Sequence, residues 1–228
     1  MGLTSLGDLE LNDIYYGDAM KLGKRIPDNS IDLIFTDPPY AHEYLYLYEW
    51  LAEWASRVLK DDGFLISYAG VYWKNKVYQI MDQHLEYFYD YVEYNTGNST
   101  VLWPRKTISR YKSLLCYRKK GGTGLPVTNV IGVFVDDKIK KFGDKRYHKW
   151  GQVESTARYY IEVFTDQNDI VIDPFAGGGT TPVVCKKLHR LHIGFENDLE
   201  SFKIARERLL GEPVPVQTQQ LSLEGINV

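Results

Sequence analysis

The chain has 228 residues, which suits one α/β domain with a substantial core and is short for two. Its 44% apolar and 25% charged residues exclude a disordered or collagen-like chain. The net charge of −3 is unevenly divided, because residues 105–149 hold 13 Lys or Arg against three acids while the rest of the chain is acidic. This basic segment predicts docking on phosphate, with a solvated lysine-rich loop as the alternative.

Two further features bear on the cellular compartment. No apolar run approaches the roughly 18–20 residues of a membrane helix, and the polar, acidic residues 1–13 carry no secretory signal. The two cysteines, Cys116 and Cys185, are too few for a disulfide framework. We therefore expect a cytoplasmic protein.

Apolar patterning predicts strands that alternate with helices. In the first half of the chain we expect a strand at 13–17, a strand at 31–36 buried on both faces, a helix at about 44–59 closed by Asp61-Asp62-Gly63, a strand at 64–70 and a weaker helix at 74–85. In the second half we expect strands at 87–95 and 113–118, a helix at 153–164, a strand at 169–173, a helix at 180–188, a strand at 191–195 and a helix at 199–210. The alternation indicates an α/β fold, a mostly parallel sheet with helices on both faces.

Three loops that carry chemical groups follow predicted strands: Gly17-Asp18, Asp37–Tyr40 and Phe175–Thr181. Ligands of parallel sheets bind beyond the carboxyl ends of the strands. We therefore expect the three loops to meet at one edge of the sheet.

The sequence DPFAGGGTT, residues 173–181, joins a strand to a helix. Its glycines let a ligand approach the backbone, and the free N–H groups at the helix start suit an anionic group. Glu196 ends the next strand, 23 residues after Asp173, where nucleotide-binding folds place the acid that binds ribose hydroxyls. No lysine precedes Thr180, and Pro182 replaces the third glycine of a dinucleotide fingerprint, which disfavours a P-loop and a nicotinamide oxidoreductase. A tight structural turn is the plain alternative.

The sequence TDPPY, residues 36–40, follows the most apolar strand. Asp37 supplies a carboxylate acceptor, while Pro38 and Pro39 fix φ and leave carbonyl groups with no N–H beside them. Tyr40 adds a flat ring. Rigid acceptors beside an aromatic plane suit the exocyclic amino group of a stacked base, whereas the simpler interpretation is a proline-stiffened loop.

With these two motifs the chain resembles the amino-methyltransferases of DNA, which methylate adenine N6 or cytosine N4 with S-adenosylmethionine. The resemblance covers most of residues 12–210, and the catalytic loop precedes the cofactor loop as in the permuted β group of that family. It implies a circularly permuted, Rossmann-like seven-stranded sheet, in which strand 13–17 pairs beside 191–195 and strand 113–118 is antiparallel. It also implies one domain at 1–210, with a target-recognition insertion at about 96–149 and a tail at 211–228.

The resemblance assigns roles to matching residues. Catalysis falls to Asp37, Pro38, Pro39 and Tyr40. The cofactor is expected at Asp18, Lys149, Gln152, Asp173, Pro174, Phe175, Ala176, Gly177, Gly179, Thr180, Thr181, Glu196 and Asn197. One departure is Lys149-Trp150, where the family usually has Lys-Pro. No metal is expected, because Cys185, His189 and His192 lack a fourth ligand in metal spacing.

The implied activity is site-specific methylation of adenine N6 in a flipped base of double-stranded DNA, as in restriction–modification systems, by a nucleoid-associated enzyme. Asp-Pro-Pro-Tyr favours adenine, since Ser-Pro-Pro-Tyr is commoner in cytosine-N4 members. Cytosine N4, RNA as substrate, a non-catalytic nucleic-acid-binding subunit and a homodimer stay open. The expected DNA contacts combine cations with an aromatic side chain at Trp103, Arg105, Lys106, Arg110, Lys138, Lys140 and Lys141.

Overall fold

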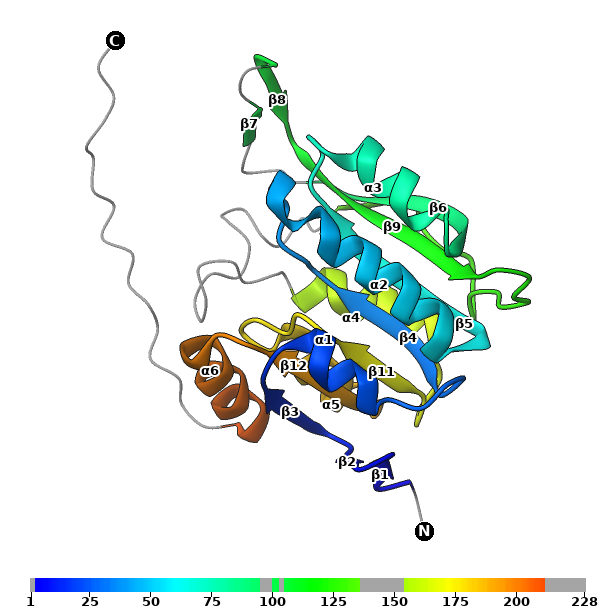
Figure 1. The fold of residues 1–228 in the computed structure, drawn as a ribbon, viewed down its shortest axis with the longest axis vertical. Coiled ribbons are helices and arrows are strands. Elements are labelled where there is room, and N and C mark those ends of the chain that lie inside the picture. The colour runs from blue at the N-terminus through cyan, green and yellow to red at the C-terminus, as the bar shows by residue number, and fades with distance from the viewer. Residues whose placement is uncertain (1–2, 95–99, 103–104, 136–153, 212–228) are drawn as a thin grey trace.

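The computed structural model describes residues 3–94, 100–102, 105–135 and 154–211. Its centre is a mixed sheet of eight strands (Figure 1). These are β3 (Asp13–Tyr16), β4 (Ile31–Thr36), β5 (Leu59–Ala69), β6 (Leu85–Tyr94), β9 (Tyr111–Lys119), β10 (Val133–Val135), β11 (Ile170–Asp173) and β12 (Leu191–Glu196). Their order across the sheet is β10-β6-β9-β5-β4-β11-β12-β3.

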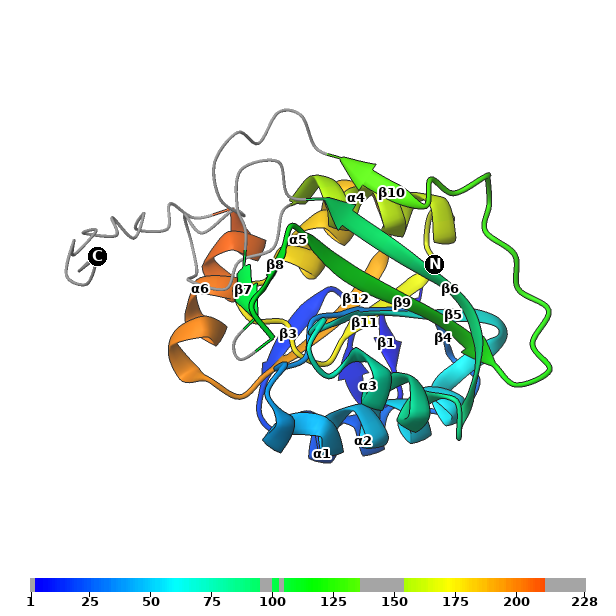
Figure 2. The ribbon, with the colours of Figure 1, turned by 90° about the horizontal axis from the view of Figure 1, so that it is seen from above.

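Helices cover both faces of this sheet (Figure 2). One face carries α1 (Ala19–Leu22), α2 (Leu45–Val58) and α3 (Lys74–Met81), and the other carries α4 (Glu154–Phe164), α5 (Thr180–Lys187) and α6 (Leu199–Leu210). Short 3₁₀ turns occur at η1 (Gly23–Arg25) and η2 (His42–Tyr44). Two antiparallel hairpins lie outside the sheet, β1 (Ser5–Leu6) with β2 (Leu9–Glu10), and β7 (Thr100–Leu102) with β8 (Thr107–Ser109).

The strand pairing confirms the predicted α/β fold class. Strands β3, β12, β11, β4 and β5 are parallel neighbours, and β9 runs antiparallel between β5 and β6. The N-terminal strand β3 pairs with β12 through Tyr16 opposite Glu196, so the two ends of the domain close the sheet together as a permuted order requires. The expected seven strands are joined by an eighth, because β10 adds in parallel to the outer edge of β6.

The expected turn at Asp61-Asp62-Gly63 is wrong, because these residues lie inside β5. The chain leaves α2 directly into an extended conformation at Leu59, with φ −63° and ψ 140°. Gly63 makes this path possible, since a Cβ there would lie 2.8 Å from the Ile31 carbonyl oxygen. The register between β4 and β5 shifts at the same place. Gly63 is therefore explained by the close approach of β4 and β5, although the sequence pattern predicted that it ends the helix.

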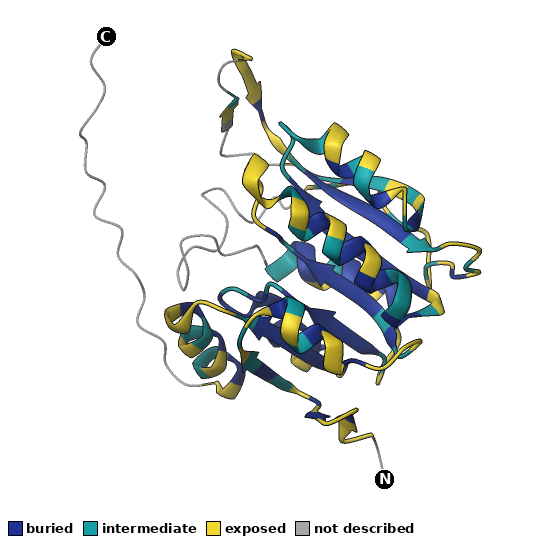
Figure 3. Ribbon diagram, viewed as in Figure 1, coloured by how far each residue is buried: buried dark blue, intermediate teal, exposed yellow. Residues whose placement is uncertain are grey.

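Each face of the sheet buries its own apolar core (Figure 3). Ile34 packs with the α2 side, whereas Leu33 and Phe35 pack with the α4 side. Strand β4 is thus buried on both faces, which accounts for its continuous apolar run. The central strands are therefore rigidly held, and their carboxyl ends are fixed points for the loops that follow.

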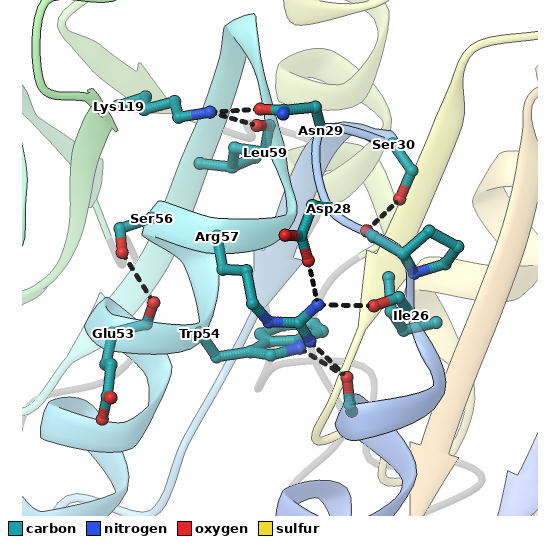
Figure 4. Close-up of polar contacts among 12 residues, drawn as sticks. Ile26, Asp28, Asn29, Ser30, Glu53, Trp54, Ser56, Arg57, Leu59 and Lys119 are labelled. Atoms are coloured by element: carbon teal, nitrogen blue, oxygen red, sulfur yellow. Dashed lines mark hydrogen bonds and ion pairs between the residues drawn. The ribbon is translucent and has the colours of Figure 1, made fainter.

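The connection from α1 to β4 is fastened to α2 by polar contacts (Figure 4). The Arg57 guanidinium donates to the Ile26 carbonyl at 2.8 Å, to the Gly23 carbonyl at 2.9 Å and to the Asp28 carboxylate at 2.5 Å. The Trp54 indole N–H also donates to the Gly23 carbonyl, at 2.9 Å. These bonds hold the segment between β3 and β4 and leave the opposite strand ends free to carry the site.

Candidate active site

Four neighbouring parallel strands end at the same edge of the sheet. Strands β4, β11, β12 and β3 are adjacent in that order, and they end at Thr36, Asp173, Glu196 and Tyr16. The ends of β3, β4 and β11 begin the three loops singled out in the sequence, and β12 ends at Glu196. The predicted convergence of the loops at one sheet edge is therefore correct.

The glycine loop after β11 uses a left-handed backbone at two positions. Gly177 has φ +51° and Gly179 has φ +79°, a region that other residues adopt only with strain. A Cβ on Gly179 would lie 2.9 Å from the Ala205 Cβ, so this glycine lets α6 pack against the start of α5. A Cβ on Gly177 would meet nothing within 4 Å. The loop therefore presents an open backbone surface at Gly177.

Glu196 connects the end of β12 to the glycine loop. Its carboxylate accepts the N–H of Gly177 and the N–H of Asp198, both at 2.7 Å. Burial raises the pKa of this half-buried carboxyl above its ordinary value, against the opposing effect of these N–H donors. Each carboxylate oxygen keeps a lone pair after these bonds, so Glu196 can also accept from ligand hydroxyls. Asn197 follows it and is exposed.

Asp18 lies beside Glu196 but has a local task as well. The Gly17 N–H donates to the Glu196 carbonyl at 2.8 Å, which brings the start of α1 to the end of β12. The Asp18 carboxylate accepts the Met20 N–H at 2.7 Å and so caps α1. The Asp18 residue is exposed.

Asp173 is buried, with 4% of its surface exposed. Its carboxylate accepts from the Thr36 hydroxyl at 2.7 Å and from the Phe175 N–H at 3.0 Å. Burial raises the pKa of Asp173 to about 6 despite these donors. Because Thr36 immediately precedes Asp37, the bond ties the glycine loop to the TDPPY loop.

Most other residues of the predicted cofactor loop are also buried. These are Pro174, Ala176, Gly179, Thr180 and Thr181. Phe175 is half-buried and its ring lies edge-on to Trp50, with centroids 6.0 Å apart. The residues that the loop exposes to a ligand are thus fewer than the motif suggests, and the buried ones fix its shape.

The TDPPY loop presents a carboxylate and a phenol side by side. The Tyr40 hydroxyl donates to the Asp37 carboxylate. Burial raises the pKa of Asp37 to about 6, and the positive charge of Lys112 and the hydrogen bond from Tyr40 oppose this rise. The Tyr40 ring is 38% exposed, and a Cβ on the adjoining Gly70 would lie 2.6 Å from the Tyr40 Cβ. Because Gly70 has no side chain, it leaves room for Tyr40 at this edge of the sheet.

The β7–β8 hairpin extends from the same edge of the sheet (Figure 1). Arg105 between its strands stacks on Tyr72, with the guanidinium carbon 4.0 Å from the ring centroid. Next to Tyr72, Trp73 packs on His42 with ring centroids 4.7 Å apart. Lys106 and Arg110 are exposed on the same hairpin. The remaining predicted contacts lie outside the described residues: Trp103, Lys138, Lys140, Lys141, Lys149 and Gln152.

Comparison with known proteins identifies the fold and the family. A family model described as DNA methylase matches residues 31–207, a span that contains both loops. The chain belongs to the DNA methylase family. Type II methyltransferase M.HpaI of Haemophilus parainfluenzae is 28% identical over 239 residues, which cover 86% of this chain and 73% of that protein. The predicted membership of the amino-methyltransferase family is thereby confirmed.

Two solved structures have the same fold as this DNA methylase. The M1.HpyAVI–SAM complex superposes with a TM-score of 0.72 at 24% identity, over 86% of this chain and 98% of that one. The cytosine-N4-specific PvuII DNA methyltransferase superposes with a TM-score of 0.70 at 19% identity, over 90% of this chain and 95% of that one. These likenesses support the permuted Rossmann-like architecture.

Sequence patterns missed three residues near the TDPPY loop of this DNA methylase. Glu93 is buried, with 5% exposed, and its carboxylate accepts from the Tyr68 hydroxyl at 2.8 Å. Lys112 lies opposite Glu93 in the β6–β9 register. Burial raises the pKa of the Tyr68 phenol well above its ordinary value, so it remains a donor. None of the three belongs to a motif, and the signal that marks them is the charge of Glu93 and Lys112 within apolar strands.

Within the described ranges no group of three or more His, Cys, Asp or Glu residues is arranged to hold a metal ion. No described helix is long and apolar enough to cross a membrane. Cys116 and Cys185 are buried thiols without a disulfide.

Proposed function

We propose that this DNA methylase transfers the methyl group of S-adenosylmethionine to N6 of an adenine in double-stranded DNA. The observation that carries the proposal is the meeting of two loops on the neighbouring strands β4 and β11. Asp37 follows one strand and the open turn at Gly177 follows the other. A carboxylate that can accept from an amine thus lies beside a backbone surface that suits a nucleoside.

S-adenosylmethionine fits the groups at this edge. The open space at Gly177 leaves room for the adenosyl part, and the Glu196 carboxylate can accept from both ribose hydroxyls. Asp18 would lie beside the adenine of the cofactor. When bound, the sulfonium supplies an electrophilic methyl group, which these residues orient. Lys149 and Gln152 stay predicted contacts of the methionine end.

Asp37 and Pro38 would act on the amine of the target base. Adenine N6 is a poor nucleophile because its lone pair is delocalised into the ring. Hydrogen bonds from the amino group to the Asp37 carboxylate and the Pro38 carbonyl favour a pyramidal nitrogen and localise that pair. They also stabilise the positive charge that develops during attack, and alignment of nitrogen, methyl carbon and sulfur supplies much of the remaining acceleration.

The target base must leave the duplex to reach this loop, as bases do in DNA methyltransferases generally. Tyr40 would stack on the extruded base, while its hydroxyl orients the Asp37 carboxylate. Pro39 is exposed beside it and keeps the loop rigid. Proton loss from the methylated amine follows the transfer, and a pKa of about 6 lets Asp37 exchange that proton with solvent near neutral pH.

The β7–β8 hairpin would carry DNA contacts within the recognition insertion at about 96–149. Arg105, Lys106 and Arg110 are cations near the rim of the site, and phosphate contacts from such residues set the register of a duplex. The stacked Arg105 and Tyr72 keep one of these charges in a fixed place. The basic residues at 138–141 and a homodimer remain predictions.

The test of the proposal is transfer of tritiated methyl groups from S-adenosylmethionine to unmethylated duplex DNA, followed by nucleoside chromatography. We expect label in 6-methyladenine. Label in 4-methylcytosine would move the activity to the other base of the family. Label in RNA alone would overturn DNA as substrate, and no label with any nucleic acid, despite cofactor binding, would favour a non-catalytic subunit.

A further inference from the structure

A second group of charged residues lies beneath the TDPPY loop, on β5, β6 and β9. Glu93 on β6 accepts a hydrogen bond of 2.8 Å from the Tyr68 hydroxyl of β5. Lys112 on β9 lies opposite Glu93, and its ammonium is 5.3 Å from the centroid of the Tyr68 ring. Tyr68 therefore bridges the carboxylate and the ammonium.

This group adjoins Asp37 across the sheet. Thr36, the last residue of β4, pairs with Ser67 of β5. The next residues of the two strands, Asp37 and Tyr68, therefore lie level with each other. Strand β9 pairs with β5 on its other side, with Leu114 opposite Tyr68. Lys112 lies two residues beyond Leu114 toward the edge that carries the site. The order across this edge is therefore Asp37, Tyr68, Lys112 and Glu93.

Glu93 is buried here, whereas Lys112 is half-buried. Tyr91 and Leu114, the nearest inward neighbours of Glu93 and Lys112 along β6 and β9, belong to the apolar core on the α4 face. The desolvation of a buried carboxylate such as that of Glu93 costs free energy that a nearby cation only partly offsets. Stability alone thus gives little reason for a carboxylate and an ammonium here, whereas an electrostatic task at the loop does.

Asp37 interacts with titratable groups on several of the described elements. These are Tyr40 of its own loop, Tyr48 of α2, Tyr68 of β5, Glu93 of β6, Lys112 of β9 and Asp173 of β11. Among these described neighbours the phenols are uncharged at neutral pH, and the carboxylates repel charge on Asp37. Lys112 is the cation of the set.

We propose that Lys112 is a positioning residue that keeps Asp37 ionised as an acceptor for the target amine, with Tyr68 and Glu93 holding the ammonium in place. This inference rests on the catalytic role proposed above for Asp37. Lys112 does not touch the transferred methyl group. It acts through the charge of Asp37, because a neutral carboxyl would offer a proton where the amine needs an acceptor.

The effects on Asp37 have opposite signs. Lys112 lowers the pKa of Asp37, whereas Glu93 and burial raise it, with a result of about 6. Loss of the ammonium therefore moves this pKa up, and loss of the Glu93 charge moves it down. The activity of an enzyme that needs ionised Asp37 falls at acid pH, so the acid limb of its pH profile follows the same two directions.

The experiment measures single-turnover methyl transfer to unmethylated duplex DNA from about pH 5 to about pH 9, a range that spans the ionisation of a raised carboxyl. The variants are Lys112→Met, Lys112→Arg, Glu93→Gln and the double variant Lys112→Met/Glu93→Gln. Lys119→Met is the matched control, because Lys119 lies on the same strand at the far edge and pairs with Asp61. Circular dichroism and S-adenosylmethionine affinity report on the fold of each variant.

We expect Lys112→Met to shift the acid limb upward by about 1–3 pH units, the usual effect of a close opposite charge. From a pKa of about 6, this shift lowers the ionised fraction of Asp37, and with it the rate at pH 7, by about twofold for one unit and about 90-fold for three. Lys112→Arg should retain the wild-type limb, Glu93→Gln should shift it downward, and the double variant should lie between the single variants. Coincident limbs in folded Lys112→Met, Glu93→Gln and wild type would overturn the inference. So would equal shifts in Lys119→Met.

One further variant separates this inference from the function on which it rests. If Asp37→Ala transfers methyl groups at the wild-type rate, the catalytic role of Asp37 fails and the inference fails with it. If Asp37→Ala is inactive while the limbs of the Lys112 and Glu93 variants coincide with wild type, only the role of Lys112 fails.

Discussion

Replacement of Glu196 by alanine tests how this DNA methylase holds its cofactor. The carboxylate already accepts two backbone N–H groups at 2.7 Å, one from Gly177 and one from Asp198, so it is fixed before a ligand arrives. Ribose hydroxyls would add charge-assisted hydrogen bonds to an acceptor that needs no reorganisation. The loss of such bonds costs about 1.5–3 kcal/mol, which corresponds to a rise in Kd of roughly 12-fold to 150-fold.

Isothermal titration with S-adenosylmethionine measures this Kd for Glu196→Ala, for Glu196→Gln and for the control Glu200→Ala. Glu200 is an exposed acid in the first turn of α6, so its removal changes the charge equally and leaves the glycine loop intact. Glu196→Gln keeps one carbonyl oxygen for the Gly177 N–H and should lose less affinity than Glu196→Ala. An unchanged Kd in Glu196→Ala, or an equal loss in Glu200→Ala, would refute the reasoning.

Three other predictions concern stability and DNA binding. In denaturant unfolding, Gly179→Ala should lower the free energy of unfolding more than Gly177→Ala. Both positions have a left-handed backbone, in which a residue with a Cβ costs about 1–2 kcal/mol. Only the Cβ added at 179 would also meet another atom, the Ala205 Cβ at 2.9 Å. Burial lowers the pKa of His192 to about 4, so between pH 6.5 and 4 the unfolded chain binds a proton that the folded chain does not. As the pH is lowered through this range, the free energy of unfolding should decrease by up to about 3 kcal/mol relative to that of His192→Leu. Parallel curves of unfolding free energy against pH for the two proteins would contradict this. Two triple alanine variants, Arg105/Lys106/Arg110 and Lys138/Lys140/Lys141, test the DNA contacts. In each, the slope of log DNA affinity against log salt concentration should flatten by roughly 0.9 per lost phosphate contact. Unchanged slopes in both variants would mean that these charges face only solvent.

Much of the fold could be predicted because its signals are local and repeated. The strand at 31–36 is apolar at Ile31 and from Leu33 to Phe35 since both of its faces are covered. The order of the two loop motifs implied the permuted sheet. The pairing of β3 with β12 followed from that order and is present. Strand β10 could not be predicted, because its Val133–Val135 run is too short to stand out from the irregular segment around it.

The position of Glu93, the acidic residue beneath the TDPPY loop, could not be predicted because β6 contains a bulge. Simple alternation along β6 assigns Tyr87 and Glu93 to the same face. The register of β6 with β9 shifts between Tyr87 and Tyr89, and an extra residue in a strand reverses the faces beyond it. Tyr87 therefore packs near Tyr78 on the α3 side, while Glu93 meets Tyr68 on the α4 side. No pattern in the sequence EYFYDYVEY marks that reversal.

The motif at 173–181 illustrates a different limit. The resemblance assigns Asp173 to the cofactor, and in the structure its carboxylate accepts hydrogen bonds from the Thr36 hydroxyl and the Phe175 N–H. A motif records which residues a loop needs, but not whether each one faces the ligand or holds the turn. The Thr36 contact spans 137 positions of the sequence, so only the folded chain reveals it.

The division of labour between the two loops is most directly tested with Asp37→Ala, measured in parallel for methyl transfer to duplex DNA and for S-adenosylmethionine affinity. The Asp37 carboxylate faces Tyr40 and is separate from the Gly177–Glu196 contact that would hold the cofactor. We expect transfer to fall to background while the Kd for S-adenosylmethionine stays within about threefold, well under the change of a full hydrogen bond. Transfer at the wild-type rate, or a loss of cofactor affinity as large as that of Glu196→Ala, would contradict the account.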